Sequence, residues 1–342
     1  MMNDERNKSN ATADSDNRLP FRNALESRNA STFRSYLQLM RLPNVFTAMA
    51  DVAMGFLFVQ AGGAKWTPTS WDFATLATLI AASSLLYIAG MVLNDVFDLE
   101  IDRRERPERP IPSGRVSLDA ARRLGWRLLV LGVATGTSAV FFTGSLRSGV
   151  VAAVLATAIL LYDAWLKRTP LGPVAMGACR TLNVLLGMSV IEGQFHTEHW
   201  LVAGAIGVYV AGITWFARKE SQRSSRLQLS AAALVIVIGI AMLAWLPRWS
   251  DRVIPELHDV IFSVQRWHLL VVLTGVWVLR RFLLAIADPT PQRVRMAVSQ
   301  GILSIVMFDA AACYAVRGVF CAAMILLLLV PAMLLGRWIE TT

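Results

Sequence analysis

Long stretches of mostly apolar residues alternate with short polar connections along the chain. They cover approximately 43–61, 73–93, 125–143, 148–166, 171–192, 200–216, 229–247, 267–287, 296–316 and 318–336. Several approach the ~20 residues that a helix needs to cross the ~30 Å hydrocarbon layer of a membrane. Lipid offers no partner to backbone polar groups, so such stretches are predicted to be helices. Only Arg317 and Gly318 separate the last two, and the pattern therefore allows nine or ten helices.

The composition agrees with a membrane protein and excludes a soluble domain. Hydrophobic residues make up 55% of the 342 residues and charged residues only 17%, whereas roughly 25% of a soluble domain is charged. The three cysteines lie within apolar stretches, which argues against a disulfide scaffold. The net charge of +9 comes from cations crowded between those stretches, so we expect no nucleic-acid partner. We predict an all-α, polytopic membrane helix bundle surrounded by lipid.

The distribution of basic residues predicts an orientation. Lysine and arginine are much more frequent after the even-numbered stretches than after the odd-numbered ones. Cytoplasmic loops of membrane proteins are enriched in these residues, so the N-terminus is predicted to be cytoplasmic. Residues 1–34 are polar, contain no apolar core and are predicted to form a disordered cytoplasmic tail. Residues 35–342 are predicted to form a single transmembrane domain.

An acidic cluster follows the second apolar stretch. Asn94, Asp95, Asp98 and Asp102 fall on one face of a helix, because three or four residues complete each turn. Carboxylates this close repel one another unless a cation neutralises them, and Mg²⁺ typically combines one or two carboxylates with substrate phosphates. The alternative is a solvated helix end with alternating charge. The start of the cluster directly on an apolar stretch, where carboxylates are costly, favours a metal-diphosphate site.

These residues resemble a known family. Asn94, Asp95, Asp98 and Asp102 match the N-D-x-x-D-x-x-x-D signature of the UbiA family of intramembrane prenyltransferases. R-P-I-P-S-G at Arg109–Gly114 is similar to the continuation of that signature, and Tyr162–Arg168 is similar to the element that closes the fourth helix. The resemblance extends over roughly residues 35–316. Within the family it is greatest to the UbiA-like EboC proteins, through Met40–Asp51 and Leu166–Pro173.

The resemblance implies a bundle around a central cavity that transfers an isoprenyl group from a prenyl diphosphate to an aromatic or lipid-like acceptor. It implies a bacterial inner-membrane protein with a cytoplasmic active site, in which Mg²⁺ is the cofactor. Asp95, Asp98 and Asp102 would be the catalytic residues and would hold the Mg²⁺. The substrate-binding residues implied by the family motifs are Asn44, Asn94, Arg109, Tyr162, Lys167 and Arg168. Taken alone, Asn44 is equally compatible with a helix cap and Tyr162 with an interfacial anchor.

One departure from the family pattern opens an alternative. The family carries a second aspartate-rich motif after the sixth helix, but this chain has Arg218, Lys219 and Glu220 there. We expect these three residues to bind substrate, with the two cations replacing a second metal ion. The alternative is a non-catalytic protein that binds or helps export a prenylated or aromatic precursor.

Four polar residues inside apolar stretches leave another question open. Asp51, Arg180, Asn183 and Asp309 lie where ionisable groups are costly and usually face a cavity or one another. A structural ion pair of Arg180 with Asp51 or Asp309 and a role toward substrate are both compatible with the sequence.

Overall fold

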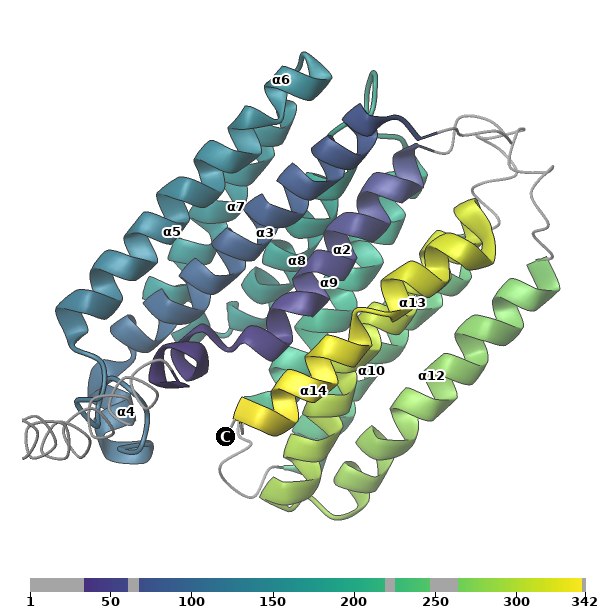
Figure 1. Cartoon of the computed structure of the whole chain (residues 1–342). Coiled ribbons are helices and arrows are strands. Elements are labelled where there is room, and N and C mark those ends of the chain that lie inside the picture. Colours follow the sequence, from purple (N-terminus) through teal and green to yellow (C-terminus); the bar gives the residue numbers. More distant parts are fainter. Residues whose placement is uncertain (1–33, 61–67, 219–224, 247–263, 340–342) are drawn as a thin grey trace, which may run out of the picture.

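The computed structural model describes residues 34–60, 68–218, 225–246 and 264–339, and within them it contains helices and no strand. The helices lie side by side in one bundle (Figure 1). In chain order they are α2 (Leu42–Val59), α3 (Ser70–Phe97), α4 (Leu99–Glu105), α5 (Leu118–Ser138), α6 (Val140–Thr143), α7 (Arg147–Ala164), the 3₁₀ helix η1 (Leu166–Arg168), α8 (Gly172–Met188), α9 (Thr197–Ala217), α10 (Arg226–Ala244), α12 (Val264–Ala287), α13 (Pro291–Leu326) and α14 (Leu329–Ile339).

The helices confirm the predicted membrane bundle. Within the described residues, eight helical stretches are long and apolar enough to cross a membrane, the last of them covering Pro291–Gly336. α8 has only 17 residues but packs between α2 and α9. The described part of the predicted tail, Arg34, already belongs to a helical segment that ends at residue 40. The rest of the tail lies outside the described residues.

Gly318 reverses the chain inside the stretch that ends at Gly336. Its φ of 77° and ψ of −170° interrupt α13, and glycine adopts this conformation without the steric penalty of a side chain. Next to it, Arg317 Nε donates a hydrogen bond to the carbonyl of Leu57, near the end of α2. At the other end of α2, Pro43 lies beside Gly336. The chain after Gly318 therefore runs back along α2, as in the ten-helix alternative.

Several boundaries differ from the sequence pattern for identifiable reasons. The second helix continues to Phe97, beyond the apolar residues, because its polar end packs against protein rather than lipid. The third begins at Leu118 instead of residue 125, where Ser117 accepts a hydrogen bond from the amide of Ala120 as a helix N-cap. Amphipathic helix ends of this kind escape a prediction that rests on unbroken apolar runs.

Two helix crossings depend on glycine. A Cβ at Gly187 of α8 would overlap the carbonyl oxygen of Val52 in α2. At a second crossing, a Cβ at Gly177 of α8 would lie 2.5 Å from the carbonyl oxygen of Gly207 in α9. Small residues permit such close backbone approach between membrane helices. Since α8 also carries polar residues of the cavity, these crossings position the site.

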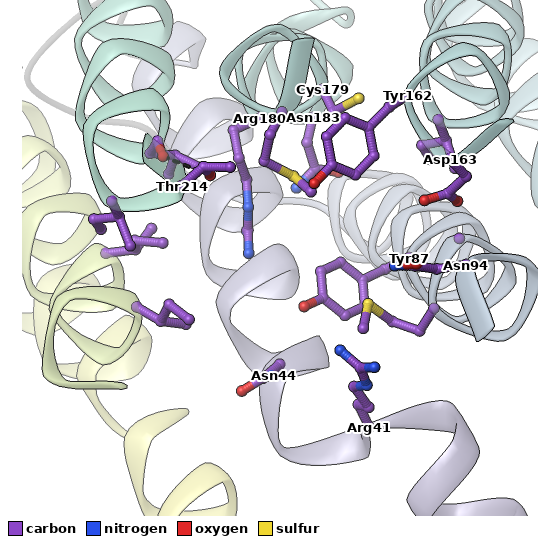
Figure 2. A pocket seen from close by; sticks show the side chains of 18 of the residues that line it. Arg41, Asn44, Tyr87, Asn94, Tyr162, Asp163, Cys179, Arg180, Asn183 and Thr214 are labelled. Carbon is purple, nitrogen blue, oxygen red and sulfur yellow. Dashed lines mark hydrogen bonds between the residues drawn. The ribbon is translucent and has the colours of Figure 1, made fainter. Parts of the chain in front are cut away.

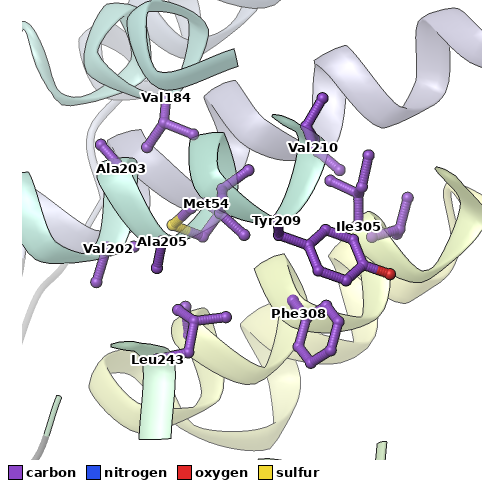
Figure 3. Packing of buried hydrophobic residues seen from close by; sticks show 14 of the residues in the cluster. Met54, Val184, Val202, Ala203, Ala205, Tyr209, Val210, Leu243, Ile305 and Phe308 are labelled. Atoms are coloured by element: carbon purple, nitrogen blue, oxygen red, sulfur yellow. The ribbon is translucent and has the colours of Figure 1, made fainter. Parts of the chain in front are cut away.

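Aromatic packing joins α9 to α13 in the buried core (Figure 3). The rings of Tyr209 and Phe308 meet edge to face with centroids 5.1 Å apart, an arrangement that aromatic quadrupoles favour. The Tyr209 hydroxyl donates a 3.0 Å hydrogen bond to the carbonyl of Gly301, which satisfies its polar end inside the bundle. α13 is thereby fixed as one wall of the cavity.

The α2–α8 crossing yields the first prediction. We expect Gly187→Ala to lower the free energy of unfolding by about 1–3 kcal/mol, because the added methyl group forces two backbones apart. Gly204→Ala is the matched control: a Cβ there meets only the flexible end of Met242, at 3.7 Å. Thermal unfolding of both purified variants in detergent measures the difference. Equal melting temperatures would contradict the close crossing.

Candidate functional site

The site is a cavity of about 420 Å³ inside the bundle, a volume typical of small-molecule pockets. Its walls come from α2, α3, α7, α8, α9 and α13, and most of them are apolar. Polar side chains are gathered at two places on the walls (Figure 2). Arg41, Asn94 and Asp163 line the cavity near the joint of α3 and α4, where Asp95 contacts Arg41, and the other set lies deeper between α2, α3 and α8. We call the first place, together with the aspartates at the joint, the aspartate end, and the second place the inner wall.

The aspartate end is built where α3 gives way to α4. α3 ends at Phe97, and Asp98 has φ −93° and ψ 4°, so the aspartates do not share one uninterrupted helix as the sequence suggested. The main chain nevertheless keeps its connections, since the amide of Asp98 donates to Asn94 O and the amide of Asp102 to Asp98 O, each at 2.9 Å. The three carboxylates therefore stay on one side of the joint.

Asp95 and Asp102 share a single guanidinium. Arg109 Nη1 lies 2.7 Å from Asp102 Oδ2 and 3.3 Å from Asp95 Oδ1. Arg109 belongs to the proline-containing loop after α4, which folds back over the joint. Both aspartates are buried, with 4% and 5% of their surfaces exposed. Charges hidden this deeply require a partner, and the loop supplies it.

Asp98 is held by the connection between α7 and α8. Lys167 Nζ lies 2.8 Å from Asp98 Oδ2 and donates a 2.8 Å hydrogen bond to Asn94 Oδ1. Arg168 Nη2 lies 3.4 Å from the other oxygen of Asp98 and also donates to the carbonyl of Phe97. The structure thus brings together the predicted aspartates, Asn94, Arg109, Lys167 and Arg168.

Arg41 belongs to the same cluster although the sequence did not single it out. Its Nη2 lies 2.9 Å from Asp95 Oδ1, and it lines the cavity beside Asn44. Within the described part of the chain, Arg41 is the one non-glycine residue with a positive φ, 46°. Such backbone strain persists only where surrounding contacts enforce it. The one signal in the sequence is its place just before the Leu42-Pro43 start of α2.

The carboxylates suit Mg²⁺ chemically, but they are not gathered around one point. The described residues contain no group of three or more His, Cys, Asp or Glu side chains placed to hold a metal ion. Each aspartate instead faces a basic side chain of the protein. This pairing fits a site in which one or two carboxylates take up Mg²⁺ together with substrate phosphates, and in which the basic side chains then turn to those phosphates.

The remaining predicted residues divide into three groups. Asn44 and Tyr162 line the cavity as expected. Arg218 does not contact the aspartates, since its guanidinium donates to the carbonyl of Thr169 in the connection before α8. Lys219 and Glu220 lie outside the described residues.

The inner wall contains one of the ion pairs that the sequence left open for Arg180. Its Nη1 lies 2.7 Å from Asp51 Oδ2, and its Nη2 donates to Thr47 at 2.7 Å. The amide of Asn183 donates to the same Asp51 oxygen at 2.9 Å. Arg180 and Asn183 both line the cavity, so the structural pair and a position facing a ligand occur together.

Comparison with known proteins gives consistent relatives. The UbiA prenyltransferase family model matches residues 49–296. The digeranylgeranylglyceryl phosphate synthase of Saccharolobus solfataricus is 30% identical over 174 residues, which are 50% of this chain and 55% of the relative. The enzyme of the same name from Metallosphaera sedula is 34% identical over 168 residues, 48% of this chain and 55% of the relative. The chain matches about half the length of these curated relatives.

Solved structures share the fold. A UbiA homolog from Aeropyrum pernix aligns with a TM-score of 0.58 at 17% identity, over 78% of this chain and 96% of that one. A UbiA homolog from Archaeoglobus fulgidus bound to DMAPP and Mg²⁺ aligns with a TM-score of 0.52 at 13% identity, over 79% of this chain and 99% of that one. The similarity to the EboC subgroup stays a prediction. Since the family match covers well over half of its residues, the chain belongs to the UbiA prenyltransferase family.

Proposed function

We propose that this integral membrane protein transfers an isoprenyl group from a prenyl diphosphate to an aromatic or lipid-like acceptor, with Mg²⁺ as cofactor. The observation that carries the proposal is the aspartate end, where three carboxylates and a set of basic side chains meet beside an apolar cavity. Carboxylates suit a hard cation and guanidinium groups suit phosphate oxygens. The apolar walls suit an isoprenyl chain.

The charges of the aspartate end support one metal ion rather than two. The three aspartates contact four basic side chains, which leaves one net positive charge when the neighbouring buried carboxyl group of Asp163 holds a proton. A fully ionised prenyl diphosphate carries about three negative charges, and one Mg²⁺ reduces them to one. The occupied site would then be neutral, whereas a second Mg²⁺ would leave it with two positive charges. The four cations that contribute are Arg41, Arg109, Lys167 and Arg168.

The proposed reaction follows from these contacts. Asp95, Asp98 and Asp102, assisted by Asn94, would hold the Mg²⁺, whose charge would make the diphosphate a better leaving group. Lys167 and Arg109 exchange their aspartate contacts for diphosphate oxygens and stabilise the charge that develops there. The bond between C1 of the isoprenyl chain and the diphosphate oxygen breaks, and C1 bonds to the acceptor. The proton that the acceptor releases leaves with the diphosphate.

The cavity walls protect the allylic cation formed in that step. Apolar side chains such as Leu155, Ile159 and Ile213 exclude water that would otherwise capture it. The Tyr162 ring, also on the wall, presents a π face that can stabilise positive charge.

The orientation belongs to the proposal as well. α4 lies at the end of the bundle opposite α6 (Figure 1), and basic residues are frequent in α4, in η1 and in the connections around them. By the distribution of Lys and Arg, this end faces the cytoplasm, in the proposal that of a bacterial cell with the protein in its inner membrane.

Substitution of the aspartates tests the proposal. We expect Asp98→Asn to lower prenyl transfer by about 100-fold or more, because it removes a charge that holds Mg²⁺ and leaves Lys167 without its ion pair. Asp95→Asn is expected to act in the same direction. The measurement is transfer of a radiolabelled isoprenyl group by purified protein across a panel of aromatic and lipid acceptors. Glu100→Gln is the control, since Glu100 is exposed and its one ion pair among the described residues is with Arg103. Unchanged transfer by both aspartate variants would refute the assignment.

The number of metal ions is a second test. Titration of Mg²⁺ into protein saturated with a non-hydrolysable prenyl diphosphate analogue is expected to show one ion bound per site by calorimetry. Lys167→Gln is expected to weaken binding of the analogue by about tenfold, because it removes a nearly buried charge. Arg168→Gln should weaken it less, since 52% of the Arg168 side chain is exposed. Two bound ions per site would contradict the charge balance.

A non-catalytic binding protein is the second candidate. The contact of Arg218 with Thr169, at the position where the family pattern has an aspartate-rich motif, favours it. The two candidates differ in turnover: Mg²⁺-dependent binding of the prenyl diphosphate analogue without transfer to any acceptor would support the carrier.

The orientation has its own test. Glu105→Cys, at the end of α4, and Ser145→Cys, beside α6, place exposed thiols at opposite ends of the bundle. In intact cells, a membrane-impermeant maleimide is expected to label only the Ser145 variant. Labelling of the Glu105 variant alone would reverse the proposed orientation.

A further inference from the structure

The inner wall contains a second carboxyl group beside its Asp51–Arg180 ion pair. Asp309 of α13 is completely buried, and within the described part of the chain its oxygens have no hydrogen-bond partner other than the neighbouring carboxyl group of Asp51. It lies close enough to Asp51 and Arg180 to interact with both electrostatically. Asp309 also lies beyond residues 49–296, the part that matches the family model. A second carboxylate at this depth is costly, so its presence here calls for an explanation.

The net charge of the inner wall is zero or negative. Arg180 is always protonated, and Asp51 neutralises it at 2.7 Å. If Asp309 holds a proton the group of three is neutral, and if it does not the group carries one negative charge. In neither state does the wall offer an uncompensated positive charge to a ligand. This distinguishes it from the aspartate end, which has a surplus cation.

Hydroxyl groups without partners face the cavity next to this group. Within the described residues, the hydroxyls of Tyr87 and Tyr162 make no hydrogen bond to the protein, although both residues line the cavity. The guanidinium carbon of Arg180 lies 5.5 Å from the centre of the Tyr87 ring. Figure 2 shows the hydroxyls of Tyr87 and Tyr162 and the guanidinium of Arg180 directed into the same space. Their arrangement is that of a binding surface for a small polar group.

We propose that the inner wall binds the acceptor through an uncharged, hydroxyl-bearing group and discriminates against carboxylate and phosphate groups. A hydroxyl can accept from a tyrosine or from Arg180 while it donates to a neighbouring oxygen. An anion would have to compete with Asp51 for Arg180 and would lose its hydration without gaining a free cation. The inference deepens the proposed function and rests on it only in calling the ligand an acceptor.

The position of this wall also indicates which part of the acceptor it holds. Tyr87 precedes Asn94 by seven residues on α3, which corresponds to about 10 Å along the helix axis. The group bound at Tyr87 is therefore the recognition group, and the reacting atom lies on the side of the molecule that faces the aspartate end.

Two phenols of similar size provide the test on the unmodified protein. 4-Hydroxybenzyl alcohol and 4-hydroxybenzoate differ mainly in the charge of the group opposite the phenol. Calorimetry on purified protein in detergent is expected to show at least about tenfold tighter binding of the alcohol. Equal or tighter binding of the benzoate, or no binding of either, would overturn the proposal.

Substitution of the carboxyl groups beside Arg180 tests whether their charge causes the preference for the alcohol. Asp51→Asn combined with Asp309→Asn leaves Arg180 uncompensated, so the ratio of the two affinities is expected to shift toward the benzoate by about tenfold or more. Ser148→Ala is the control, because Ser148 pairs with Ser189 away from the cavity and its loss leaves the ratio unchanged. A folded double variant with the ratio of the unmodified protein would refute the role of these two carboxyl groups.

Two further measurements keep the test decisive. If the double variant does not fold, Tyr87→Phe replaces it and is expected to weaken binding of the alcohol more than that of the benzoate, whereas an unchanged ratio would count against the proposal. Asp98→Asn is expected to abolish transfer and to keep the affinity ratio. Failure of the prenyl-transfer proposal therefore appears as absent turnover by the unmodified protein. Failure of the inner-wall proposal appears as equal or tighter binding of the benzoate by the same protein.

Discussion

The contact of Lys167 with Asp98 and Asn94 is the interaction on which the rest of the site depends. The ammonium group of Lys167 lies 2.8 Å from Asp98 Oδ2 and 2.8 Å from Asn94 Oδ1. Through it, the joint of α3 and α4 is tied to the connection that leads into α8. Carboxylates next to a hydrocarbon layer must be paired, so this connection has to stay where the aspartates are. The start of α8 is thereby fixed at the same end of the bundle.

α8 transmits that constraint to the inner wall. It crosses α2 and α9 at glycines, where backbones approach too closely for any side chain. Close crossings allow little rotation of the helix, which keeps Arg180 opposite Asp51 and beside Tyr87. The two polar parts of the cavity are thus not independent, because the same helix begins at one and carries the main cation of the other.

Much of the fold and of the aspartate end could be predicted from the sequence because the physical signals are local. Apolar runs long enough to span a membrane must be helices, and the Asn94–Asp102 spacing places its carboxylates on one side of the chain. Arg41 could not be found in this way, since it reaches Asp95 only through a strained backbone and a contact between residues far apart in sequence. The reversal at Gly318 was equally hidden, because one glycine between two apolar runs is compatible with one helix or two. Arg218 shows the opposite case. Its position in the motif predicted a contact with substrate, whereas in the structure its guanidinium donates to the main-chain carbonyl of Thr169.

The difference in charge between the two polar parts of the cavity suggests how one cavity can distinguish two substrates. The aspartate end has a surplus cation and therefore attracts an anion that brings its own Mg²⁺. At the inner wall Asp51 cancels the charge of Arg180, and Asp309 can only add negative charge. In the low dielectric of the bundle such differences in charge are weakly screened. Binding of an anionic group is therefore favoured at the aspartate end and disfavoured at the inner wall. A diphosphate and an uncharged acceptor are then directed to opposite ends of the same cavity before any bond is broken, and the apolar walls between them hold the isoprenyl carbon that is exchanged.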